Sequence, residues 1–229
     1  MKVSRRTLIR WHVWLGWLIG VPLVLWTVSG LIMVARPIEE VRGTDLRAEL
    51  PPLPAVAAVV PKVPPRSLAS LSLRQTALGP RWIAIGTDER RFAADPRNGL
   101  PLPSLDRAQA EAAARAYRSS PGRVASVRYT PADRPPLDLR QPRPAWAVDF
   151  SDRARFYIDA ETGELLAVRT GFWRFYDVMW GLHIMDLPTR EDTHNPLIII
   201  LGALAAVGSV LGVVVLVLRY VRPRRLAEA

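Results

Sequence analysis

The sequence predicts an α+β membrane protein in which two transmembrane helices flank a duplicated, extracytoplasmic α+β domain. Three observations support this fold class. Apolar residues are concentrated near the two ends of the 229-residue chain, the centre is rich in Pro, Arg and Asp, and two central stretches repeat each other. The bulk composition of 49% hydrophobic and 23% charged residues would also fit a soluble protein. The uneven distribution of these residues therefore carries the prediction.

Both apolar segments are long enough to cross a bilayer, which takes about 20 residues. The first occupies residues 8–35 and has no formal charge from Trp11 to Ala35 when His12 is neutral. It is longer than the apolar part of a cleaved signal peptide and lacks a small-x-small cleavage site, which predicts a retained signal anchor. The second occupies residues 195–218, where Asn195 is a helix cap and Pro196 suits the first helical position.

Basic residues flank both spans on the sides that face the chain ends. By the positive-inside rule, residues 1–7 and the basic tail 219–229 are predicted to be cytoplasmic. Residues 37–194 would then be periplasmic, at the inner membrane of a bacterium. Most of the net charge of +10 comes from these flanks, so it indicates topology and lipid headgroups rather than nucleic acid. The flanking residues are Lys2, Arg5, Arg6, Arg10, Arg219, Arg222, Arg224 and Arg225.

Each span carries two glycines four residues apart: Gly16 and Gly20 in the first, Gly208 and Gly212 in the second. Small residues at this spacing allow close helix approach in lipid. The two pairs lie at similar depth, so we expect the spans to pack on each other through them. The same faces could instead form a homodimer.

The central region begins with a Pro-rich tether at residues 36–66 and continues into two related copies. Residues 81–102 and 145–166 align without gaps at an offset of 64, with seven identities that include Trp82 with Trp146. This similarity predicts a duplication, with a degenerate first copy at residues 67–103 and a second at residues 104–171.

Each copy contains strand patterns and a tight turn. In the turns, Asp95 and Asp159 would cap the backbone while Gly99 and Gly163 supply a positive φ. Calcium-binding or catalytic carboxylates are the alternative for these aspartates. Residues 104–117 predict a helix with Ser104 as its N-cap. Its predicted buried face is Leu105, Ala108, Ala112 and Ala116.

The second copy resembles a PepSY domain, whose closing strands read W-x-V followed by an aromatic, V/I-D-x-x-T-G-E pattern. The matching residues are Trp146, Val148, Tyr157, Ile158, Asp159, Thr162, Gly163 and Glu164. The segments RWHVWLGWLIGVPLVLWTVSGL and WGLHIMD resemble the PepSY-associated transmembrane family. This resemblance covers essentially the whole chain. It implies a binding or regulatory role toward an envelope protein or peptide, such as a peptidase.

Members of that family with membrane histidines imply haem-linked or ferric-siderophore reduction as an alternative, with a membrane reductase as the partner. His12 is the candidate ligand of haem b in this chain. Val214 and Val215 are expected opposite it, and the other two histidines lie on the far side of the membrane. A bis-histidine haem would therefore need a second copy of the chain or another subunit.

The segment 172–194 predicts an amphipathic juxtamembrane helix lying on the outer membrane face. Its polar residues His183, Asp186 and His194 are a candidate mixed nitrogen and oxygen metal site.

The sequence contains no cysteine, which excludes disulfides, thiolate metal sites and covalently attached haem. It also contains no nucleophile elbow, phosphate loop or dinucleotide-binding pattern. We therefore expect a binding protein rather than an enzyme and predict no firm cofactor, with an electron-transfer accessory as the alternative.

Overall fold

The computed structural model describes residues 4–63 and 67–220. It divides into a helix unit, Met1–Arg36 with Phe175–Ala229, and a sheet unit, Pro37–Arg174. The basic residues Lys2, Arg222, Arg224 and Arg225 of the predicted cytoplasmic ends lie outside the described residues.

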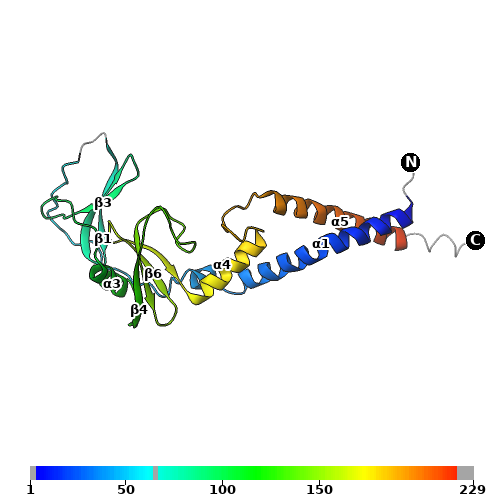
Figure 1. Ribbon diagram of the computed structural model, residues 1–229, viewed down its shortest axis with the longest axis horizontal. Helices are drawn as coiled ribbons and strands as arrows, with labels where there is room; N and C mark the ends of the chain where they lie inside the picture. Colours follow the sequence, from blue (N-terminus) through cyan, green and yellow to red (C-terminus); the bar gives the residue numbers. More distant parts are fainter. Residues whose placement is uncertain (1–3, 64–66, 221–229) are drawn as a thin grey trace, which may run out of the picture. The chain divides into compact units, whose positions relative to one another are not determined.

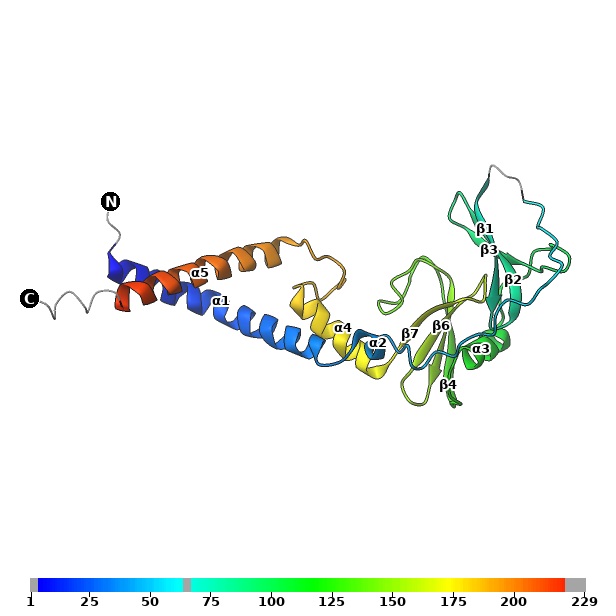
Figure 2. The same cartoon turned by 180° about the vertical axis from the view of Figure 1, so that it is seen from behind.

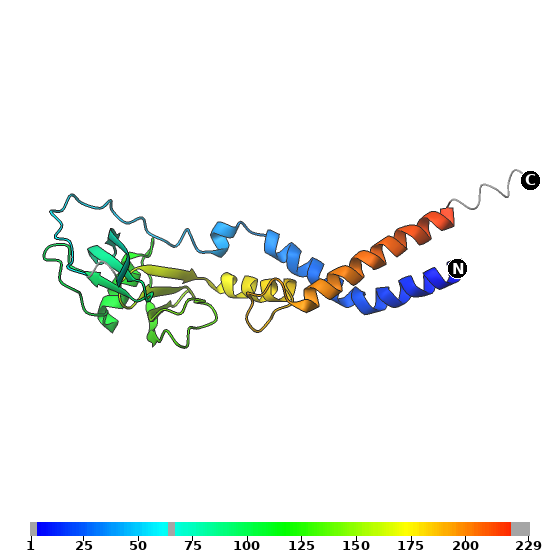
Figure 3. The ribbon, with the colours of Figure 1, turned by 90° about the horizontal axis from the view of Figure 1, so that it is seen from above.

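The helix unit contains two long apolar helices, α1 (Arg5–Val34) and α5 (Pro196–Tyr220), which cross each other (Figures 1 and 3). Large apolar side chains cover their outer surfaces, and Trp17 is 80% exposed. A helix in water would present polar residues on such a surface, so these faces fit contact with lipid. The predicted spans agree with α1 and α5 to within three residues. Asn195 Oδ1 accepts the Ile198 amide at 3.2 Å, as expected of its cap.

The sheet unit contains two antiparallel sheets (Figure 2). The first has the order β1-β2-β3, formed by Leu68–Thr76, Gly79–Gly86 and Arg91–Ala94. The second has the order β4-β5-β6-β7, formed by Val124–Thr130, Ala145–Phe150, Arg155–Asp159 and Leu165–Arg169. The short α2 (Ile38–Val41) lies within the segment 36–66 that the sequence predicted as a tether. Helix α3 (Arg107–Ala116) lies between the two sheets in sequence, and α4 spans Gly171–His183.

The two sheets share their pairing register. Trp82 pairs with Ala94 in the β2-β3 hairpin, and Trp146 pairs with Ile158 in the β5-β6 hairpin, at the same offset of 64 on both strands. The preceding strands add a register shift at the same point, beside Leu68 in β1 and beside Val124 in β4. Equal registers and equal irregularities are what a duplicated unit predicts, because side-chain pairing fixes the register of a buried strand.

The second sheet is covered on both faces. On one face, α3 packs over a core that includes Phe150, Phe156 and Ile158. On the other face, Leu139 from the Pro-rich segment 131–144 packs with Tyr157. The second half therefore has a buried core on each side of its sheet.

The details of α3 differ from the prediction. The N-cap is Asp106, which forms a capping box with Gln109, while the Ser104 hydroxyl donates to Glu161. Leu105 is buried as predicted. The buried alanines are Ala110, Ala113 and Ala114, whereas the predicted alanines Ala108, Ala112 and Ala116 are exposed. The prediction was wrong because alanine occurs on several sides of this helix, so the pattern did not distinguish them.

Candidate functional site

His12 is held against the second span. Its Nδ1 lies 3.1 Å from the backbone oxygen of Gly208, and a Cβ added to Gly212 would lie 2.9 Å from the ring carbon Cε1. A carbonyl oxygen can only accept a hydrogen bond, so Nδ1 carries a proton, and the neutral form of the ring would have its lone pair on Nε2. That is the tautomer of a histidine that ligates a metal through Nε2.

The sequence predicted Val214 and Val215 opposite His12, and this prediction was wrong. The ring lies beside Gly212 instead, where only a residue without a side chain leaves room for it. A bis-histidine haem does not fit within one chain. The second histidine, His183, meets α1 at Trp26, at least 14 residues further along, which is about 21 Å at 1.5 Å per residue.

The expected glycine-to-glycine packing of the two spans is also corrected. A Cβ on Gly208 would meet Ile19 at 3.1 Å, whereas nothing lies within 4 Å of a Cβ on Gly16 or Gly20. Ile19 and His12 of α1 occupy the space that Gly208 and Gly212 leave open on α5. A Cβ on Gly16 or Gly20 would therefore not touch α5, and the alternative that these glycines form a homodimer stays a prediction.

His183 ends α4 and docks on α1. Its ring stacks on Trp26, with centroids 4.9 Å apart and an interplanar angle of 11°. Its Nδ1 lies 3.1 Å from both the Trp26 backbone oxygen and the Ser29 hydroxyl oxygen. The Ser29 hydroxyl itself donates to the Trp26 oxygen, so Nδ1 is again the donor. Gly30 leaves room for the ring, because a Cβ there would lie 3.1 Å from Cε1.

The metal site predicted from His183, Asp186 and His194 does not assemble. Asp186 accepts from the Thr189 hydroxyl and from the backbone amides of residues 189, 191 and 192. These bonds, led by the Thr189 hydroxyl, lower the pKa of Asp186. His194 contacts the Thr193 hydroxyl instead. The Asp186 carboxylate therefore caps its own loop rather than facing the histidines. Within residues 4–63 and 67–220, no group of three metal-binding side chains is found.

The two repeated turns share a backbone plan. The Gly99 amide donates to the Asp95 backbone oxygen at 2.8 Å, and the Gly163 amide donates to that of Asp159 at 2.9 Å. The side chains of both aspartates accept amides inside their turns. Gly99 and Gly163 have φ values of +71° and +78°. The structure thus places all four residues in turn-forming roles.

The second turn is closed by ion pairs within the chain. Arg143, from the Pro-rich segment, pairs with the buried Asp159. Arg74 of β1 pairs with Glu164 at 2.9 Å and so ties the first half to the second. The carboxylates of this turn are therefore satisfied by the chain itself.

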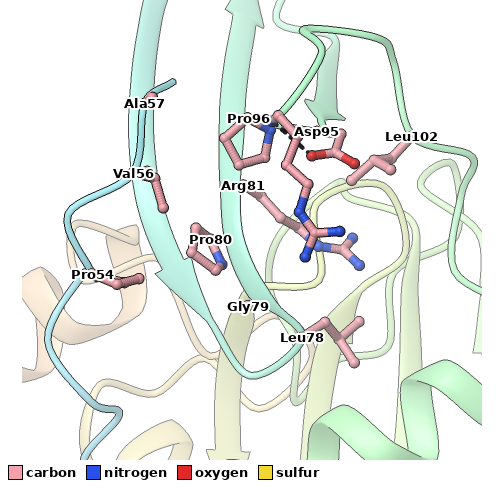
Figure 4. Close-up of a pocket in the computed structure, with 11 residues that line it drawn as sticks. Pro54, Val56, Ala57, Leu78, Gly79, Pro80, Arg81, Asp95, Pro96 and Leu102 are labelled. Atoms are coloured by element: carbon pink, nitrogen blue, oxygen red, sulfur yellow. Dashed lines mark hydrogen bonds between the residues drawn. The ribbon is translucent and has the colours of Figure 1, made fainter. Parts of the chain in front are cut away.

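The first turn instead borders a pocket of about 390 Å³ (Figure 4). Arg81 points into the space between Asp95 and Leu78, beside Leu102 (Figure 4). One Nη of Arg81 is buried and has no hydrogen-bond partner among the described residues. Burial lowers the pKa of this guanidinium, and its electrostatic interactions with Tyr117 and Asp95 offset this only in part. The lining residues are Pro54, Val56, Ala57, Leu78, Gly79, Pro80, Arg81, Asp95, Pro96, Arg97 and Leu102.

The sequence reasoning missed Arg81 and Arg97 as site residues. A signal for them exists in the repeat. At the positions of Ala145 and Glu161 in the second copy, the first copy carries Arg81 and Arg97. The two copies share the backbone of this turn, but only the first carries arginines at these two positions. The turn is therefore more positively charged in the first copy than in the second.

A family model described as the PepSY-associated TM region matches residues 9–227. No curated protein and no solved structure matches the chain. The two apolar helices, the sheets between them and this match over nearly the full length agree, and the chain belongs to the PepSY-associated transmembrane family.

Proposed function

We propose that this chain is a binding or regulatory module of the bacterial inner membrane whose sheet unit docks an envelope protein or peptide. The helices α1 and α5 anchor it, with α1 as a retained signal anchor. The basic residues beside both spans support cytoplasmic chain ends and a periplasmic sheet unit.

The observation that carries the proposal is the pocket beside Asp95. It combines an incompletely paired guanidinium with apolar walls in a cavity of about 390 Å³. Cavities of this size with a few polar groups are the usual form of ligand sites. The corresponding turn of the second copy closes itself by ion pairs, which supports a separate role for the first.

Photo-crosslinking from the pocket rim tests the proposal. Val56 lines the pocket and is 41% exposed, so benzoyl-phenylalanine at this position should cross-link a docked partner in cells. Tyr129 on β4 is 52% exposed, does not line the pocket and is the matched control. We expect a discrete adduct from position 56 that is absent from position 129. No adduct from position 56, or the same adducts from both, would count against the proposal.

An accessory role in transmembrane electron transfer is the second candidate. The tautomer of His12 favours it, because Nε2 keeps the lone pair that an axial iron ligand needs. Haem would supply the electron-carrying iron, and a second chain or another subunit would supply the other ligand. A Soret band in detergent-purified protein that disappears in His12→Ala supports this candidate, and a colourless protein contradicts it.

A further inference from the structure

We propose that the pocket beside Asp95 binds the C-terminal carboxylate of a peptide whose last residue is apolar. The proposal rests on the proposed binding function and names the chemistry of its ligand.

The positive side of the pocket is supplied by two arginines. The buried Nη of Arg81 lacks a hydrogen-bond partner in the described residues, and neither guanidinium forms an ion pair within that same part of the chain. Asp95 is the lining carboxylate, so two cations face one anion. A desolvated cation without full compensation is unfavourable, and the charge of a carboxylate bound in the pocket would reduce this cost. Such a carboxylate would accept charge-assisted hydrogen bonds from the guanidinium nitrogens of Arg81 and Arg97 that line the pocket, rather than from the covered Nη1.

The Arg81 guanidinium packs against the second half. A Cβ added to Gly163 would lie 3.4 Å from Arg81 Nη1, so the glycine that makes the second turn also leaves room for this guanidinium. A side chain fixed by its neighbours loses little conformational entropy when a ligand binds.

The walls favour an amphiphilic ligand. Leu78 and Leu102 lie beside Arg81 (Figure 4), and Pro54, Val56 and Pro80 complete the apolar lining. An apolar side chain next to a carboxylate would bury surface against these walls, which stabilises the complex. Inorganic phosphate would meet the arginines alone and leave the walls uncovered.

The space is open because of Gly79. At the same offset of 64, two residues before the aligned stretch, the second copy has Arg143, which reaches the turn carboxylate Asp159. In the first copy, a Cβ added to Gly79 would meet nothing within 4 Å, and its φ of +98° favours glycine. The side chain that fills this space in the second copy is thus missing from the first, so the space beside Arg81 stays open to a ligand.

Calorimetric titration of the full chain in detergent tests the proposal. The probes are acetyl-Ala-Ala-Leu with a free carboxylate, the same peptide as its amide, and inorganic phosphate. We expect saturable binding of the acid and affinities lower by about tenfold or more for the amide and for Arg81→Met. Arg97→Gln should weaken binding less, because Arg97 is exposed. Arg107→Gln, an exposed arginine outside the pocket, should leave affinity unchanged.

Equal affinity for acid and amide, equally tight phosphate, no binding at all, or loss of affinity in Arg107→Gln would each overturn the proposal. If Arg81→Met does not fold by circular dichroism, the acid–amide comparison and Arg97→Gln decide the result. A cross-link from position 56 that persists while acid and amide do not differ would reject the carboxylate and leave the binding function standing.

Discussion

The β2-β3 hairpin and the β5-β6 hairpin have the same register, and each leads into a turn capped by aspartate and completed by a glycine with positive φ. Their side chains use charge differently. In the second half, Arg143 and Arg74 neutralise the turn, whereas in the first half Arg81 borders an open pocket. A duplicated backbone can therefore keep one copy closed by ion pairs and leave the other with an open pocket.

The largest expected effect comes from removing the turn carboxylates. Asp159 is 1% exposed, pairs with Arg143 and accepts two backbone amides. Asp159→Ala should destabilise the sheet unit by about 3 kcal/mol, because it removes the closer of the two carboxylates that pair with Arg143 and leaves two backbone amides without their acceptor. Asp95→Ala, which loses one amide bond from Arg97, should cost about 1 kcal/mol. Denaturant unfolding followed by circular dichroism measures both, and equal losses would remove the contrast between the halves.

The second effect concerns Arg155 and the corresponding Arg91. Arg155 pairs with Asp149 at 2.6 Å and with Asp138 at 3.0 Å. Burial opposes its charge, but these partners raise the pKa of Arg155 overall. Burial, with a hydrogen bond to Asp138, also raises the pKa of Tyr157 to about 12. Arg155→Met should destabilise the sheet unit by about 2–4 kcal/mol at neutral pH. Arg91 forms no ion pair or side-chain hydrogen bond among the described residues, so Arg91→Met should cost less than about 0.5 kcal/mol.

The same network predicts a dependence on acid. Burial raises the pKa of Asp149, but its hydrogen bonds to Arg155, Ser126 and Arg128 outweigh this, so the pKa lies below 3.8 in the folded state. Its contribution to stability is therefore complete above the unfolded pKa of 3.8 and is lost as the pH falls through the lower folded value. Arg155→Met should shift the acid-unfolding midpoint upward, while Arg91→Met should not. An unchanged midpoint in Arg155→Met would contradict this assignment.

A third contrast lies in the helix unit. Gly212→Ala places a methyl group 2.9 Å from the His12 ring, whereas Gly16→Ala meets nothing within 4 Å. Forcing an extra group into this contact should cost about 1–3 kcal/mol. Thermal unfolding in detergent should show a lower midpoint for Gly212→Ala alone. A loss in Gly16→Ala instead would indicate that this face packs against a second copy.

The smallest effect concerns Trp82 and Trp146, which occupy equivalent positions in the two copies. Trp82 Nε1 donates to the Val59 oxygen of the tether, and Trp146 Nε1 donates to the Leu105 oxygen before α3, both at 2.9 Å. Trp82→Phe should cost about 1 kcal/mol through this bond and increase proteolytic cleavage in the tether. Trp146→Phe should leave the tether as resistant as in the wild type. Equal tether cleavage in both variants would show that Val59 is held by other contacts.

The sequence was sufficient to predict the features whose pattern extends over many residues or occurs twice. Two long apolar runs predicted α1 and α5, and the gapless repeat predicted two hairpins with equivalent turns. The pocket could not be predicted, because its walls come from the tether, the β1-β2 turn and the segment after β3. The metal site failed for a related reason: spacing placed His183 near Asp186, but the ring docks on Trp26 and the carboxylate caps its own loop.

The topology on which envelope binding depends can be measured directly, because the chain has no cysteine. Asp133→Cys places one thiol in an exposed loop of the sheet unit, and Ser4→Cys places one at the start of α1. With the outer membrane permeabilised and the inner membrane intact, a membrane-impermeant maleimide should label position 133 and should label position 4 only after lysis. Labelling of position 4 before lysis, with position 133 protected until lysis, would contradict the account.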